Sequence, residues 1–183
     1  MPPPGLWQTF FEPKEILSKL GLITQFDHVV EFGCGYGTFT TPRAQIVNGR
    51  VSTFDLDEQM IAHARGQLPA EILNKVQFHH LDFCFATQVL GKSIADYVML
   101  FNILHGEEPI RLLEQAFDLL CPEGRAGIIH WNYDPDTPRG PPMDIRPQPE
   151  ELADLAHGAG FMVSEMIDLP PFHYGFQLQK PPS

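Results

Sequence analysis

Short apolar runs alternate along the chain with segments in which apolar residues recur at helical spacing. Short apolar runs are typical of buried strands, and helical spacing is typical of helices with one face in a core. The predicted strands are residues 28–32, 51–54, 76–80, 94–101, 124–131, 161–168 and 172–179. The predicted helices are residues 13–20, 38–48, 57–67, 109–121 and 150–157.

The alternation of strand and helix predicts parallel strands joined by right-handed crossovers, and therefore a doubly wound α/β sheet. The last two predicted strands are joined only by Leu169, Pro170 and Pro171. Because this link is too short for a helical crossover, the final strand is expected to run antiparallel to its neighbour. We expect a single domain over residues 1–183, with residues 1–25 as a helical cover.

Residues 132–147 form the most individual stretch of the chain, with five prolines and one glycine. A loop of this length is often a functional lid, and we expect it to close over the site. Arg139 and Arg146 in this loop are candidates to clamp a carboxylate or phosphate on a small acceptor. The alternative is that both arginines pair with carboxylates of the same loop, those of Asp134, Asp136 and Asp144.

The charge of the chain argues against nucleic acid as a partner. The 183 residues carry a formal net charge of -11, and the 12 Lys and Arg form no basic stripe. Binding through the phosphate backbone needs such a stripe. Nucleic acid is therefore not expected to bind.

The cysteines and the apolar runs predict a cytoplasmic protein without a metal. Cys34, Cys84 and Cys121 are odd in number and form no C-x-x-C pair, so they indicate reduced thiols rather than a zinc site or disulfides. No stretch reaches the roughly 18 apolar residues of a membrane helix. The first residues lack the basic segment and apolar core of a secretory signal. No membrane association is expected.

The first predicted strand ends in a turn rich in glycine. In HVVEFGCGYGTFT, Glu31 and Phe32 are followed by Gly33, Gly35 and Gly37. Ligands of doubly wound sheets bind at the carboxyl ends of strands. Without Cβ atoms, the backbone of this turn can adopt a positive φ and a ligand can lie directly on it. The alternative is a tight turn between strand and helix that binds no ligand.

Three successive strands end in acidic residues, which are Glu31, Asp55 and Asp82. Asp55 can accept hydrogen bonds from the hydroxyls of a ribose, because Asp57 is the better cap for the helix that follows. The three acids together suit a ligand with a ribose, an exocyclic amine and a positive charge. Pyrophosphate is disfavoured, because the spacing is G-x-G-x-G and Glu31 would repel it.

These residues resemble the class I S-adenosylmethionine-dependent methyltransferases. VVEFGCGYGTFT is similar to their first motif, FDLD to their ribose-binding acid, and HHLDF to their adenine-edge segment. DYVMLFNILHG is similar to their fourth motif, and LLCPEGRAGIIHW to the turn before their fifth strand. The resemblance covers residues 26–179. One departure is Glu123, where glycine is more usual, and Gly124 is expected to supply the flexibility instead.

The resemblance implies a Rossmann-like sheet of seven strands in the order 3-2-1-4-5-7-6, with the last strand antiparallel. It also implies S-adenosylmethionine as cofactor and S-adenosylhomocysteine as product. Glu31 would lie near the methionine amino group, Asp55 would hold the ribose, and Asp82 would accept from the adenine amine. The other implied cofactor contacts are Gly33, Cys34 and Gly35 in the turn, Leu56 and Phe83 beside the adenine, and Phe101 and Asn102 below the sulfur.

The acceptor side carries two histidines on the same rim. His105 follows the fourth strand and His130 ends the fifth, so either is a candidate general base or steering group. The alternatives are a histidine at a helix start for His105 and a packed strand residue for His130. A base is needed only when the acceptor must lose a proton. Further candidates for acceptor binding, besides the two arginines, are Trp131, Tyr133 and His173.

The predicted function is methyl transfer to an oxygen, nitrogen or carbon atom of a small-molecule acceptor. Cover over the acceptor can come only from residues 1–20 and 132–147, which favours a small molecule. The segment FNILHG lacks the Asn/Asp-Pro-Pro-aromatic pattern that relatives use on amide or exocyclic amine nitrogens. The alternatives are aminopropyl transfer, methylation of a partner protein, and a non-catalytic protein that binds the cofactor. A monomer or a homodimer is expected.

Overall fold

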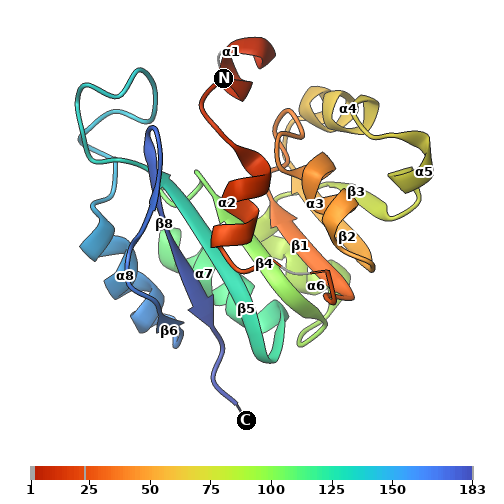
Figure 1. The fold of residues 1–183 in the computed structure, drawn as a ribbon. Coiled ribbons are helices and arrows are strands. Elements are labelled where there is room, and N and C mark those ends of the chain that lie inside the picture. The colour runs from red at the N-terminus through yellow and green to blue at the C-terminus, as the bar shows by residue number, and fades with distance from the viewer. Residues whose placement is uncertain (1–2, 23, 183) are drawn as a thin grey trace.

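The computed structural model describes residues 3–22 and 24–182 (Figure 1). Residues 1, 2 and 23 of the predicted N-terminal cover, and residue 183 at the end of the predicted domain, lie outside the described residues. Eight strands form one sheet in the order β3-β2-β1-β4-β5-β8-β6, and β7 pairs with β8. The strands are β1 (His28–Phe32), β2 (Arg50–Asp55), β3 (Val76–His80), β4 (Ala95–Phe101), β5 (Leu120–Trp131), β6 (Met162–Val163), β7 (Ile167–Leu169) and β8 (His173–Gln179).

Helices cover both faces of this sheet, and Figure 1 shows α2 in front of the central strands and α7 behind them. The helices are α1 (Pro4–Gln8), α2 (Pro13–Lys19), α3 (Thr40–Ile46), α4 (Glu58–Gly66), α5 (Ala70–Leu73), α6 (Ala86–Leu90), α7 (Pro109–Leu119) and α8 (Pro149–Gly158), with a short 3-10 helix η1 (Phe83–Phe85). The sequence did not predict α1, α5, η1 or α6, because each is too short to show a helical period.

The two largest apolar clusters of the described residues, one on each face of the sheet, form most of the core. Side chains of α7 and α8 pack on one face, and α7 buries Leu112, Leu113, Ala116 and Leu119 along one side. Side chains of α2 and α3 pack on the other face together with Phe10 and Phe11. Burial of this apolar surface holds the sheet rigid, so the strand ends have fixed positions.

The last strands confirm the predicted sheet order and the antiparallel direction of the final strand. β5 pairs with β8 antiparallel, with Ile129 opposite Gly175. The predicted strand 161–168 is divided into β6 and β7, which both pair antiparallel with β8. The division falls at Ser164, whose side-chain hydroxyl accepts a hydrogen bond from the backbone N–H of Gln177. Because a side chain replaces a backbone partner there, regular pairing stops.

The segment around Glu123, expected as a turn before the fifth strand, lies inside β5 as an irregularity of that strand. β5 begins at Leu120, and its register against β4 is irregular between Leu120 and Arg125. The positive φ in this segment (63°) belongs to Glu123. Gly124 is needed for another reason, since a Cβ atom there would lie 2.8 Å from the carbonyl oxygen of Cys121. The left-handed conformation therefore falls on Glu123 and not on Gly124.

Replacing Glu123 with Gly is expected to raise the free energy of unfolding by about 0.5–1 kcal/mol. Glu123 is exposed and adopts a left-handed conformation that costs a residue with a Cβ about 1 kcal/mol. Glycine removes that cost, but the greater conformational freedom of glycine in the unfolded chain offsets part of the gain in stability. Urea denaturation measures the change, and Glu123→Ala, which keeps the Cβ, is the control that should gain nothing. Equal stability of all three proteins would contradict the strain.

Candidate active site

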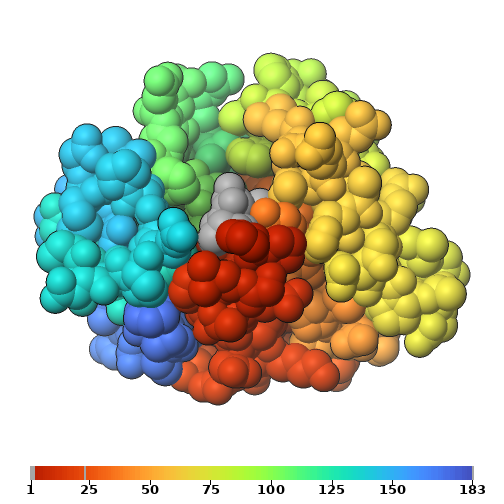
Figure 2. Space-filling view, turned by 90° about the horizontal axis from the view of Figure 1, so that it is seen from above, coloured from red at the N-terminus to blue at the C-terminus, as the bar shows by residue number. Residues whose placement is uncertain are grey.

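A pocket of about 830 Å³ lies at the carboxyl ends of the parallel strands. Figure 2 views this edge from above, where the N-terminal residues (red) lie between the 132–147 loop (cyan) and the segment after β1 (orange). The lining residues are Trp7, Glu31, Gly33, Cys34, Gly35, Thr38, Phe39, Asp55, Phe83, Phe101, Asn102, Ile103, His105, Gly106, Trp131, Arg139, Gly140 and Pro141. The N-terminal segment, four strand ends and the loop after β5 therefore contribute to one pocket.

The glycine turn after β1 forms the floor of the pocket. Gly33 and Gly35 both have positive φ angles, 79° and 49°, and both line the pocket. The N–H groups of Gly33 and Cys34 donate to the carbonyl of Phe54, which ties the turn to β2. Gly37 has a packing role, because a Cβ there would lie 2.9 Å from Cα of Ala64 on α4. The turn thus offers bare backbone to a ligand.

Asp55 presents an oriented carboxylate beside this turn. Its Oδ2 accepts from the backbone N–H of Gly35 at 2.9 Å, and its Oδ1 accepts from the N–H of Asp57 at 3.0 Å. Asp57 caps α4 by accepting from the N–H of Gln59, so Asp55 is not used as the helix cap. Burial and the neighbouring acids Glu31 and Asp55 raise the pKa of the Cys34 thiol, which is therefore neutral.

Glu31 is buried and carries a partner that the sequence did not reveal. Its Oε2 accepts from the hydroxyls of Thr40 and Thr53, each at 2.7 Å. The same oxygen forms a 3.1 Å ion pair with Nη2 of Arg43, whose side chain is completely buried. The sequence signal for Arg43 is a cation in the helix that follows the strand of Glu31. The number of residues between the two does not show that they pair. The negative charge of Glu31 is thus compensated under the pocket.

Two buried polar atoms of the lining have no hydrogen-bond partner among the residues that the structure describes. They are Oγ1 of Thr38 and Oδ1 of Asn102. Asn102 follows β4 with a φ of 57°, and its backbone N–H donates to the carbonyl of Ile129. Buried polar atoms are rarely left without partners, so both atoms indicate a ligand that hydrogen-bonds there.

The residues predicted beside an adenine divide into two groups. Phe83 lines the pocket and stacks on Phe32, with ring centroids 5.4 Å apart. Asp82 and Leu56 lie outside the lining. Asp82 caps η1 by accepting from the N–H of Cys84, and the side chain of Leu56 is exposed.

The two predicted catalytic histidines lie next to each other. His105 lines the pocket, and its Nδ1 lies 3.4 Å from Nε2 of His130. Nδ1 of His130 lies 3.5 Å from the carbonyl oxygen of Trp131. Burial lowers the pKa of His130 to about 3, so this ring is neutral. Burial also lowers the pKa of His105 below its usual value.

The two loop arginines differ in their contacts. Arg139 is exposed and lines the mouth of the pocket. Arg146 is buried, and neither arginine forms a salt bridge within the described residues. The guanidinium of Arg146 donates to Oγ1 of Thr137 and to the carbonyl oxygens of Asn132, Asp134, Arg139 and Pro141. Arg146 therefore organises the loop, and Arg139 is the loop arginine that lines the pocket.

Replacing Arg146 with Lys is expected to lower the free energy of unfolding by about 2–4 kcal/mol, because several carbonyl oxygens of the loop lose the planar donor that this buried side chain supplies. Lysine keeps the charge but cannot reach all of these oxygens. Limited proteolysis should then cut within residues 132–147 much faster than in the wild type. The control is Arg139→Lys, which is exposed and should leave both measurements unchanged. An unaltered cleavage rate in Arg146→Lys would contradict the role of Arg146 in the loop.

The remaining predicted acceptor residues lie in different places. Trp131 lines the pocket, whereas Tyr133 is exposed outside it. His173 is buried behind Trp131, with ring centroids 4.3 Å apart, and burial lowers its pKa to about 3. Trp7, which the sequence did not single out, lines the pocket from α1 and packs against Trp131, with ring centroids 6.2 Å apart.

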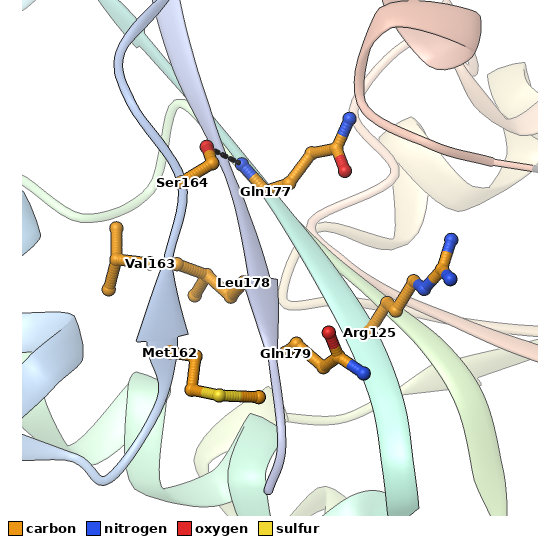
Figure 3. A pocket seen from close by; sticks show the side chains of 7 residues that line it. All are labelled: Arg125, Met162, Val163, Ser164, Gln177, Leu178 and Gln179. Atoms are coloured by element: carbon orange, nitrogen blue, oxygen red, sulfur yellow. Dashed lines mark hydrogen bonds between the residues drawn. The ribbon is translucent and has the colours of Figure 1, made fainter.

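A second pocket lies away from this site, between β5, β8 and β6 (Figure 3). Its volume is about 340 Å³, and Arg125 is the only charged residue of the described chain that lines it. Figure 3 shows Ser164 and Gln177 joined across the strands at the upper edge of this pocket. The predicted site residues all lie elsewhere.

In the described parts of the chain, no group of three or more His, Cys, Asp or Glu side chains is arranged to hold a metal ion. Over the same residues, none of the helices has the length and apolar character that crossing a membrane requires.

The mixed α/β fold, with its sheet order β3-β2-β1-β4-β5-β8-β6, is Rossmann-like. Residues 30–126 match the family described as a methyltransferase domain, which covers more than half of the 183 residues. The chain belongs to this family. Comparison with curated protein sequences finds no match.

Solved structures share the fold at low sequence identity. An S-adenosylmethionine-dependent methyltransferase from Aquifex aeolicus has a TM-score of 0.83 at 21% identity, covering 96% of this chain and 93% of its own. One from Mesorhizobium loti has a TM-score of 0.73 at 15% identity, covering 91% of this chain and 96% of its own. The [4+2]-cyclase SpnF has a TM-score of 0.78 at 14% identity, covering 93% of this chain and 80% of its own. At these identities the likeness concerns the fold alone.

Proposed function

We propose that this protein transfers a methyl group from S-adenosylmethionine to a small-molecule acceptor. The observation that carries the proposal is the coincidence, in one pocket, of an oriented Asp55 carboxylate, a bare glycine turn and unpartnered polar atoms. Each meets a different part of the cofactor. Membership of the methyltransferase domain family supports the same conclusion.

The lining fits the chemistry of the cofactor. Asp55 would accept from the ribose hydroxyls, and Phe83 would pack against the adenine. The unpartnered Oδ1 of Asn102 would accept from the amino group, and the hydroxyl of Thr38 would donate to the carboxylate. Bound there, the cofactor would supply a methyl group activated by a positively charged sulfur. Asp82 and Leu56 would complete the adenine site from outside the present lining.

The rest of the pocket leaves room for a small acceptor. Pockets for small ligands measure about 300–1,000 Å³, and this pocket, at about 830 Å³, lies toward the upper end of that range. Trp7 and the segment 139–141 line the pocket from two sides, so a long polymer would have little access. Such a site would act chiefly by aligning the acceptor with the methyl group.

His105 is the proposed general base where the acceptor must lose a proton. If Nδ1–H of His130 points to the carbonyl of Trp131, Nε2 of His130 can accept from Nδ1–H of His105. Nε2 of His105 then carries a lone pair that can take a proton. Because burial lowers the pKa of His105, its basic form persists below pH 6.5. His130 would act as a positioning residue.

The test combines cofactor binding with a search for the acceptor. Calorimetry with S-adenosylmethionine and S-adenosylhomocysteine should show binding of both. A metabolite extract incubated with an isotopically labelled methyl donor should yield a labelled product by mass spectrometry. Binding without any labelled product would favour the alternative of a non-catalytic binding protein. Tighter binding of the decarboxylated cofactor would favour aminopropyl transfer, and label on a protein band would favour a partner protein.

A further inference from the structure

Aromatic rings form much of the pocket wall away from Asp55 and Phe83. The rings belong to Trp7, Phe39, Phe101 and Trp131. Phe39 and Phe101 meet edge to face at 4.9 Å, and Trp7 meets Trp131 at an angle of 61°. Each ring is thus supported by another ring, which fixes its orientation. Such a wall favours a planar, apolar ligand, because aromatic groups prefer edge-to-face or offset contacts.

The charges around this wall favour an anion. Arg139 is the only cation among the described lining residues, and the structure records no salt bridge for it there. Of the two lining acids, Glu31 is neutralised by Arg43, and Asp55 belongs to the cofactor half. Aromatic walls also attract cations, but Arg139 would repel a cation here.

We propose that the acceptor is a planar aromatic carboxylate, whose ring lies against the half-buried Trp7, which packs on the buried Trp131, and whose carboxylate pairs with Arg139. This inference rests on the proposed function, which assigns the part of the pocket beside Asp55 and Phe83 to the cofactor. The contacts of Trp7 and Arg139 with an aromatic anion do not depend on that assignment. A guanidinium pairs with a carboxylate through two parallel hydrogen bonds, which also fixes the direction of the ring. Arg146 holds the carbonyl of Arg139 and so sets the position of this residue.

The chain offers its own probe for this proposal, because its two tryptophans are Trp7 and Trp131, and both line the pocket. We expect 2-naphthoate to change their fluorescence saturably in the presence of S-adenosylhomocysteine, and calorimetry to give the same affinity. Three further probes each lack either the negative charge or the aromatic ring, and each should bind at least about tenfold more weakly. They are the neutral 2-naphthamide, the cationic 2-naphthylmethylammonium and the aliphatic cyclohexanecarboxylate.

Variants separate the two contacts. Arg139→Gln should lower the affinity for 2-naphthoate about 10–100-fold and leave the affinity for 2-naphthamide unchanged, because only the ion pair with the carboxylate is lost. Trp7→Leu should weaken both aromatic probes, with circular dichroism verifying that it folds. Arg125→Gln is the matched control, since Arg125 is an exposed arginine in the second pocket and should change nothing.

Preference for the cation, equal binding of the aliphatic acid, or an Arg139→Gln variant with full affinity would overturn the proposal. The same samples test the proposed function separately. If S-adenosylhomocysteine binds and no aromatic anion does, the acceptor inference fails alone. If 2-naphthoate binds and S-adenosylhomocysteine does not, the proposed function fails and the aromatic anion site stands.

Discussion

Replacing Arg43 with Met is expected to lower the free energy of unfolding by about 3–5 kcal/mol. Arg43 is completely buried and faces the carboxylate of Glu31, which is buried as well. Removing the cation leaves an uncompensated charge in the interior, and this is costly even though the hydroxyls of Thr40 and Thr53 still donate to it. Methionine fills a similar volume, so the loss reports the charge rather than a cavity.

A second variant identifies the cause of that loss. In the double variant Arg43→Met with Glu31→Gln both charges are absent, and the amide oxygen of the introduced glutamine can still accept from the threonines, so most of the stability should return. The control is Lys92→Met, which breaks the exposed pair of Lys92 with Asp118 and should cost less than about 1 kcal/mol. Urea denaturation measures all three. A double variant as unstable as Arg43→Met would contradict the ion-pair explanation.

The sheet could be predicted from the sequence because each strand carries its own signal. Residues 28–32 and 95–101 are apolar runs, and the short link at Leu169–Pro171 permits only an antiparallel return. Acids at the ends of β1 and β2 follow from the same register, because neighbouring parallel strands end at the same edge. Position at a strand end is a local property, so the sequence predicts that Glu31 and Asp55 lie at the same edge of the sheet.

Contacts between distant side chains could not be predicted in this way. Arg43 lies on a helix whose pattern does not tell which polar residue faces the sheet, and its pairing with Glu31 depends on tertiary packing. For Arg146 the sequence shows the charge but not the carbonyl oxygens that surround it. Trp7 was missed because α1 is a single short turn of helix, whose position depends on contacts with Trp131.

The segment around Glu123 shows a limit of a different kind. The resemblance predicts a turn before the fifth strand with its flexibility at Gly124, whereas the segment belongs to β5 and the left-handed conformation falls on Glu123. A glycine indicates either a positive φ or a close approach, and the sequence does not distinguish the two. In the structure Gly124 is required by the close approach of the carbonyl oxygen of Cys121, which leaves no room for a Cβ atom. The strain at Glu123 was therefore hidden until the backbone angles were known.

Replacing Asp55 with Ala is expected to weaken binding of S-adenosylhomocysteine by about 2–4 kcal/mol, or about 30–1,000-fold. The carboxylate is held in place by the N–H groups of Gly35 and Asp57, so it is oriented before the ligand arrives. Two hydrogen bonds from ribose hydroxyls to this charged acceptor would be lost together. Calorimetry at constant ionic strength measures the change.

The neighbouring acid provides a matched control. Asp57→Ala removes the same charge two residues away, and it deletes the cap of α4, so it should cost about 1 kcal/mol of stability but little cofactor affinity. Asp55→Asn keeps one acceptor oxygen and should bind with intermediate affinity. If Asp55→Ala binds as tightly as the wild type, Asp55 does not hold the ribose. If Asp57→Ala weakens binding equally, the effect is one of charge or of the α4 terminus rather than of the Asp55 hydrogen bonds.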